Sequence, residues 1–312
     1  MSATERVCSD LDAALDELRG AGFRLDSIYP ADEPHTALLS RGKEQLRVTT
    51  CAGSALPAGM PPFTREFLVT RAGEQGAPGR AGMIYRDLIP GRLGGRYIAS
   101  HITIPKGGAV ADWVHYHRVA VQLIAVRRGW VKVVYEGQGE PFVMRPGDLV
   151  LQPPQIRHRV LESSAGLEVV EISCPALHET LADHDLELPT DRVDPGRDFA
   201  GQRFLRHVAA ETPWTPHGDT GFERCETAMA DATGGLAAVR VIRPGAARGF
   251  SAVAAGELQF GFVLEGAARL DHAGDHPIGR DDAFVIPPGA AWGLAEASDD
   301  LRVLEVVLPA TA

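Results

Sequence analysis

His115 and His117 open the stretch HYHRVAVQLIAVRRG, which ends at Gly129. In an extended strand these two side chains point to the same face, because residues two apart share a face. His158 lies further along, at the end of PGDLVLQPPQIRH, where a turn, a short strand and a proline stop precede the next strand. Three imidazoles on neighbouring strands of a small barrel can converge on one cation, and imidazole suits zinc, iron, nickel and copper. The sequence therefore predicts a site for one divalent transition metal whose identity stays open.

Gln122 follows the two histidines at a position whose side chain would point to the opposite face of a continuous strand. It can face the same site only if the chain turns or bulges at residues 118–121. As a neutral ligand it would leave the charge of a divalent cation uncompensated, which strengthens a Lewis acid and favours an anionic oxygen ligand. An amide cannot take a proton from a substrate, so any base must be metal-bound hydroxide, a different residue, or none.

The elements that must carry these residues are short β-rich runs, which recur from residue 64 onward between turn signals and predict a sandwich or barrel. Three blocks of this region recur in a second copy. The offsets are 140, 137 and 134 residues, from Gly94 to Gly234, Gln122 to Gln259, and Pro153 to Pro287. Such a nearly constant offset predicts two copies of one β module.

The second copy lacks the histidines. At the offset of 137, Ala252 and Ala254 replace His115 and His117, and His158 maps near Trp292. We expect a metal-free module that covers the edge strands of the first and stabilises the pair. Trp292 and Phe260 could line a ligand pocket, although aromatic residues inside a barrel more often belong to the core.

The first copy resembles the cupin superfamily, whose motifs read G-x5-H-x-H-x3,4-E-x6-G and G-x5-P-x-G-x2-H. Here the motifs read His115-x-His117-x4-Gln122-x6-Gly129 and Gly147-x5-Pro153-x-Gln155-x2-His158. The resemblance spans roughly residues 64–309 and implies two jelly-roll barrels in tandem. It implies His115, His117, Gln122 and His158 as metal ligands, with Gln122 in place of the usual glutamate and Gln155 in place of a turn glycine.

The first 50 residues are predicted to form a small α+β module. Its helix is expected within SDLDAALDELRGAGF, with Ser9 or Asp10 as N-cap and Gly20 as the stop, followed by strands in FRLDSIYP, TALLS and QLRVTT. Part of this module resembles half of a vicinal oxygen chelate unit without a complete metal set. We favour a packing or dimerisation role without chemistry. The expected boundaries are a linker at 51–63, the metal-binding barrel at 64–180, a second linker at 181–202, and the metal-free barrel at 203–312.

Two further features contain residue types that suit a catalytic or metal site. His101 lies in the predicted strand YIASHITIP, and if it faces inward it could act as a catalytic or supporting imidazole beside Gln122. The stretch HETLADHD, residues 178–185, contains ligand types but follows the last strand of the first barrel. We expect it to be a polar connector that binds nothing.

Composition narrows the function classes. The chain has 312 residues, of which 45% are hydrophobic and 23% charged, as in a globular protein. A formal charge of −10 argues against nucleic acid as a partner. No apolar run has the length of a membrane span, and the start lacks the apolar core of a signal peptide. The four cysteines are scattered, as expected for reduced thiols of a cytoplasmic protein.

The combined prediction is a metal-dependent cupin enzyme that acts on a small phenolic, dicarbonyl or polyketide-like substrate, anionic or readily enolised. Dioxygenation with iron, nickel or copper is the favoured reaction. A redox-neutral cyclase, isomerase or hydrolase with zinc or nickel as Lewis acid is the first alternative, and a non-catalytic ligand-binding cupin is the second. Cupins commonly dimerise, so a homodimer is compatible with the resemblance.

Overall fold

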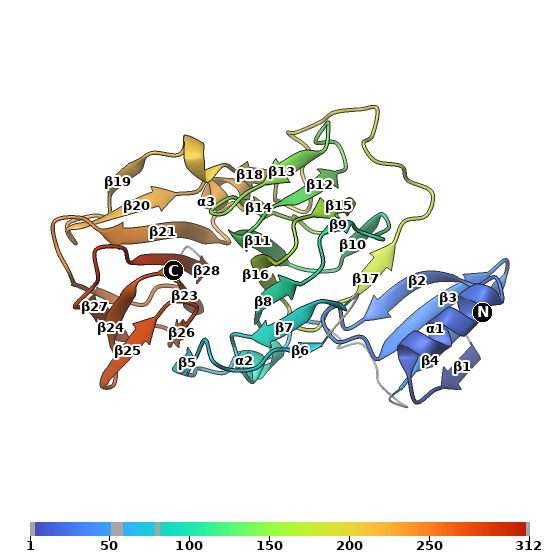
Figure 1. Cartoon of the computed structure of the whole chain (residues 1–312), viewed down its shortest axis with the longest axis horizontal. Coiled ribbons are helices and arrows are strands. Elements are labelled where there is room, and N and C mark those ends of the chain that lie inside the picture. Colours follow the sequence, from blue (N-terminus) through green and yellow to red (C-terminus); the bar gives the residue numbers. More distant parts are fainter. Residues whose placement is uncertain (1–3, 51–58, 79–81, 310–312) are drawn as a thin grey trace.

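β-Strands dominate the computed structural model, which describes residues 4–50, 59–78 and 82–309 (Figure 1). Of the predicted linker 51–63, residues 51–58 lie outside the described residues. The expected fold class is confirmed: two β-barrels follow a small α+β segment. Among the described residues, each helix is too short or too polar for a membrane span.

The N-terminal module contains the predicted helix, α1 (Leu11–Gly20), which buries one face against the adjacent strands. Asp10 is its N-cap, and the Asp10 side chain accepts a hydrogen bond of 3.0 Å from the backbone N–H of Ala13. The three predicted strands form, and a strand at Thr4–Val7 that was not predicted pairs with the last of them in parallel.

Two sheets build the first barrel. The first, called here the histidine sheet, has ten strands in the described residues and runs without a break into the N-terminal module. In spatial order its strands are β1 (Thr4–Val7), β4 (Glu44–Thr49), β3 (Thr36–Arg41), β2 (Arg24–Tyr29), β17 (Thr180–Ala182), β10 (His115–His117), β15 (His158–Ser163), β12 (Val131–Tyr135) and β13 (Phe142–Met144), with β9 (Gly108–Ala109) beside β15.

The opposing sheet, called here the glutamine sheet, has seven described strands. Their order is β18 (Leu205–His207), β14 (Leu149–Leu151), β11 (Val121–Arg128), β16 (Leu167–Cys174), β8 (Ile98–Ile104), β7 (Ile84–Asp87) and β6 (Ala77–Pro78). A short helical turn, α2 (Arg92–Gly95), precedes β8.

The second barrel repeats this plan without an N-terminal extension. Its seven-stranded sheet has the order β19 (Trp214–Pro216), β20 (Phe222–Glu226), β21 (Ala238–Pro244), β28 (Arg302–Leu308), β23 (Leu258–Glu265), β26 (Ala283–Ile286) and β5 (Leu68–Thr70). Its four-stranded sheet has the order β22 (Phe250–Val253), β27 (Ala291–Ala295), β24 (Ala267–Asp271) and β25 (Asp275–Gly279). The short helices η2 (Ala209–Glu211) and α3 (Met229–Ala232) complete the elements.

The two barrels share a core and exchange strands. Buried residues of the glutamine sheet, such as Leu123, form one cluster with buried residues of the second barrel, such as Phe260. Strand β5 lies within the range 64–180 expected for the first barrel but pairs with β26 of the second. Strand β18 follows the connector 181–202 but pairs with β14 of the first. The exchange covers edge strands of both barrels, which would otherwise expose unpaired backbone groups.

Candidate metal centre

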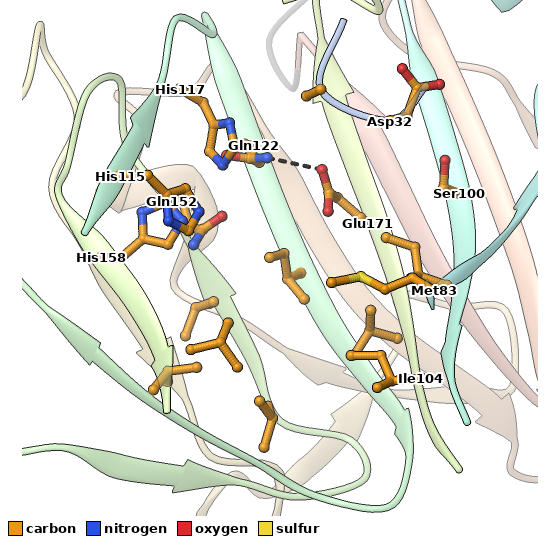
Figure 2. A pocket seen from close by; sticks show the side chains of 18 of the residues that line it. Asp32, Met83, Ser100, Ile104, His115, His117, Gln122, Gln152, His158 and Glu171 are labelled. Carbon is orange, nitrogen blue, oxygen red and sulfur yellow. Dashed lines mark hydrogen bonds between the residues drawn. The ribbon is translucent and has the colours of Figure 1, made fainter. Parts of the chain in front are cut away.

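His115, His117 and His158 come together on the inner face of the histidine sheet. His115 and His117 occupy alternate positions of β10, and His115 pairs directly with His158 of β15. One ligand nitrogen from each ring lies within 4.8 Å of the others, and all three residues are buried. Figure 2 shows the three rings grouped on one side of the pocket.

Each of the three imidazoles is oriented by a contact of its Nδ1 atom. His115 Nδ1 lies 2.8 Å from the carbonyl oxygen of Trp113, and His158 Nδ1 lies 3.0 Å from that of Ile156. A carbonyl only accepts, so in both rings Nδ1 carries the proton and Nε2 carries the lone pair. His117 Nδ1 lies 3.1 Å from Thr180 Oγ1. Metal-binding histidines typically have this second contact, which fixes tautomer and ring orientation, so the residues fit a divalent metal.

Gln122 reaches the same pocket from the glutamine sheet. The chain leaves β10 after His117 and enters the opposite sheet at Val121, so the predicted change of direction at 118–121 is a crossing between sheets. Gln122 Nε2 donates to Glu171 Oε1 at 2.9 Å. Its Oε1 atom is buried without a hydrogen-bond partner among the described residues, which leaves that oxygen as the amide's available ligand atom.

Glu171 is a pocket residue that the sequence analysis missed. It lies on β16, two positions from the backbone partner of Gln122, and Ser173 Oγ also donates to it at 3.3 Å. No Lys or Arg forms an ion pair with Glu171 within the described part of the chain. Of the alternatives left open for a base, the structure thus offers a different residue, because β16 brings a carboxylate to the Gln122 amide.

The rest of the pocket is mostly apolar. It lines a partly open cavity of about 120 Å³ between the two sheets, a volume close to that of cavities that hold one small ring. Met83, Ile104 and neighbouring aliphatic side chains form the part away from the histidines (Figure 2). Tyr135 stacks on His158, and burial raises the pKa of its phenol, which therefore stays neutral.

His101 does not join this cluster, although it was a candidate catalytic residue. It alternates along β8 with Ser100 and Ile102, whose side chains line the cavity, so it projects to the other face of the sheet. There its ring lies 3.3 Å from both Arg86 Nη2 and Glu168 Oε2. Burial and the Arg86 charge lower the pKa of His101.

The stretch 178–185 is more than the expected polar connector. Residues 180–182 form β17, which inserts between β2 and β10. His178 lines the cavity, and its ring lies 5.5 Å from that of His117. Burial lowers the pKa of His178, so the ring is neutral at pH 7.

In the second barrel the residues at the matching positions carry no histidine, but the glutamine–glutamate pair recurs. Gln259 Nε2 donates to Glu305 Oε1 at 2.7 Å. Here the carboxylate also forms an ion pair with Arg240, the residue opposite Glu305 in the sheet. In the first barrel the residue opposite Glu171 is Ser100. Phe260 and Trp292 are both buried in the core, which is where aromatic residues inside a barrel more often lie.

Comparisons with known proteins agree with this architecture. The family model for the cupin domain matches residues 100–173, which include all the site residues of β10, β11, β15 and β16. A search of curated proteins finds no matching sequence.

Solved structures with the same fold include three informative neighbours. A mutant of oxalate decarboxylase from Bacillus subtilis is 12% identical, with a TM-score of 0.55, over 84% of this chain and 80% of that chain. Protein Ylba from E. coli is 12% identical, with a TM-score of 0.55, over 82% and 96%. A mutant of salicylate 1,2-dioxygenase from Pseudoaminobacter salicylatoxidans is 15% identical, with a TM-score of 0.51, over 68% and 70%. Residues 100–173 thus form a cupin domain, and the chain as a whole has the fold of a two-barrel cupin.

Proposed function

We propose that this protein is a metal-dependent cupin enzyme that oxidises a small oxygen-rich molecule, as a dioxygenase. The observation that carries the proposal is the convergence of three oriented imidazoles in a cavity with room for one small ring. His115, His117 and His158 would hold the metal, with Gln122 Oε1 as a fourth ligand. A bound iron, nickel or copper ion supplies Lewis acidity and the redox chemistry that oxygen requires.

The residues of the chain prepare the substrate. The apolar wall excludes water and favours a ring, while the two sheets confine its position. Glu171 can accept the proton that a phenol or an enolisable dicarbonyl loses, a task that the Gln122 amide cannot perform. Gln122 holds that carboxylate at 2.9 Å, beside the histidine cluster.

The neighbours are compatible with this proposal but do not select the reaction. One is a dioxygenase and another a decarboxylase, at identities of 15% and 12%. A redox-neutral cyclase, isomerase or hydrolase is the second candidate, and the Glu171 carboxylate favours it, because proton transfer alone completes such a reaction.

Elemental analysis joined to an oxygen-uptake screen tests the proposal. We expect one transition-metal ion per chain and oxygen consumption with a catechol or a 1,3-dicarbonyl compound. His117→Ala should abolish both while the circular dichroism spectrum is unchanged. Gln122→Glu should retain the metal but change the turnover rate. Full turnover of the zinc-loaded protein without oxygen would exclude the dioxygenase and leave the redox-neutral reaction. Protein that binds none of these metals would exclude both enzymes and favour a non-catalytic ligand-binding cupin.

A cytoplasmic location and a homodimer stay predictions. Size-exclusion chromatography with light scattering tests the second of them.

A further inference from the structure

The N-terminal module contributes directly to the pocket. Ala31 and Asp32, in the connection between β2 and β3, line the same cavity as the histidines. Their position is fixed by backbone pairing, because β2 pairs with β17 and β17 pairs with β10, the strand that carries His115 and His117. Figure 1 shows the module beside β17, at the end of the first barrel away from the second. The module therefore forms part of the cavity wall, whereas a packing or dimerisation role without chemistry was expected.

Asp32 is held so that one carboxylate oxygen is left for a ligand. Arg92 Nη2 donates to Asp32 Oδ2 at 2.6 Å. The other oxygen, Oδ1, is buried and has no hydrogen-bond partner among the residues that the structure describes. Most buried polar atoms in proteins are paired, so an unpaired acceptor at a cavity wall points to a ligand that donates.

His178 presents a second unpaired acceptor. Its Nδ1 atom lies 3.1 Å from the carbonyl oxygen of Pro175, so Nδ1 carries the proton and Nε2 the lone pair. The residue is 5% exposed, and Nε2 has no hydrogen-bond partner within the described ranges. The Glu171 carboxylate lies in the same cavity and also only accepts when ionised.

We propose that Asp32, Glu171 and His178 form an acceptor wall that binds a hydrogen-bond-donating group of the substrate, a hydroxyl or an ammonium. The chelating end of the same molecule would lie at His115, His117 and His158. The N-terminal module then belongs to the substrate site and sets specificity. This inference rests on the proposed function only in that the histidine cluster binds the chelating end.

The test measures binding, with zinc as a metal that does not oxidise the probes. Calorimetric titration of the zinc-loaded protein compares 4-methylcatechol, 4-(hydroxymethyl)catechol and 4-(aminomethyl)catechol. We expect the two compounds with a donor to bind about tenfold more tightly than the methyl compound. The hydroxymethyl and aminomethyl compounds distinguish a neutral donor from a cationic one. Equal affinity for all three compounds would overturn the acceptor wall, and this comparison needs no substitution.

Asp32→Asn and Asp87→Asn form a matched pair of variants. Both remove one carboxylate from Arg92, because Asp87 Oδ2 lies 3.6 Å from Arg92 Nε, but Asp87 does not line the cavity. In Asp32→Asn the amide oxygen should turn to Arg92 and its N–H₂ group to the pocket, replacing an acceptor by a donor. We expect the preference for donors to disappear in Asp32→Asn and to persist in Asp87→Asn.

Two results would contradict this assignment: a preserved preference in Asp32→Asn, or an equal loss in Asp87→Asn. The proposed function has a separate readout in the metal-free protein. If 4-methylcatechol binds the metal-free form as tightly as the zinc-loaded form, the assignment of the metal centre is wrong. The ratio of the affinities of the three compounds would still test the acceptor wall.

Discussion

Thr180 offers a sharp test of the metal centre, because it touches a predicted ligand but not the metal position. Its hydroxyl lies 3.1 Å from His117 Nδ1, and the residue is 0% exposed. Thr180→Val keeps the shape of the side chain and removes the oxygen that orients the ring. Substitution of such a supporting group typically weakens metal binding by about 10- to 100-fold, which corresponds to about 1.4–2.7 kcal/mol.

The affinity is measured by competition for zinc with a chromophoric chelator. Thr227→Val in the second barrel is the matched control. Thr227 is also buried, and its hydroxyl donates to the carbonyl oxygen of Val239 at 2.7 Å. Both variants should lose about 1 kcal/mol of stability with the hydrogen bond, but only Thr180→Val should lose zinc affinity. Zinc affinity within twofold of wild type for Thr180→Val, or an equal loss in Thr227→Val, would refute the assignment of His117 as a ligand.

Three further predictions concern charge, backbone and pH. Ser100→Arg should recreate the arrangement of Arg240 by pairing with Glu171, and a cation so close to the site should weaken zinc binding more than about tenfold in the same competition assay. Gln155 has a φ of 63°, in the left-handed region, where the family motif has glycine. Gln155→Gly should therefore raise the free energy of unfolding, measured in urea, by about 1 kcal/mol. A free energy of unfolding below that of the wild type would contradict this prediction. Burial lowers the pKa of His207 in the folded state, so the unfolded chain binds its proton first as the pH falls. The stability of the metal-free protein should therefore decline below about pH 6.5, by up to about 1.4 kcal/mol per pH unit from this residue, and His207→Gln should reduce the slope in urea titrations at pH 5.5–7.5.

The features that follow local patterns could be predicted from the sequence. The capping of α1 by Asp10 and the apolar spacing of its buried face are local, and the helix forms where these signals lie. The short β-rich runs predicted from residue 64 onward also form strands. The meeting of His115 with His158 follows from motif spacing, because the barrel pairs β10 with β15.

The features that were missed depend on which distant segments pair. Nothing within residues 178–185 indicates that β17 pairs with β10 and β2, so His178 and Thr180 could not be placed. The exchange of β5 and β18 between the barrels is hidden for the same reason. Glu171 had a usable signal, because Glu171 and Glu305 share the offset of 134 that relates Pro153 to Pro287.

The comparison of the two barrels gives an electrostatic reason to expect a cation at the histidines. Both barrels keep a glutamine that donates to a glutamate inside the fold, at 2.9 Å in the first and 2.7 Å in the second. A nearby positive charge stabilises a carboxylate that is removed from water, fully for the buried Glu305 and partly for the half-buried Glu171. In the second barrel Arg240 supplies it, and no histidine is present at the matching positions.

In the first barrel Ser100 replaces that arginine, and the cluster of three histidines appears beside the pair. The first copy thus has the three histidines without the arginine, and the second copy has the arginine without the histidines. A divalent metal at the histidines would supply the positive charge that Arg240 supplies in the second barrel, while the shorter Ser100 leaves space for a substrate. On this reasoning Gln122 would link a metal bound at the histidines to the Glu171 carboxylate, rather than serve as a weakened version of a glutamate ligand.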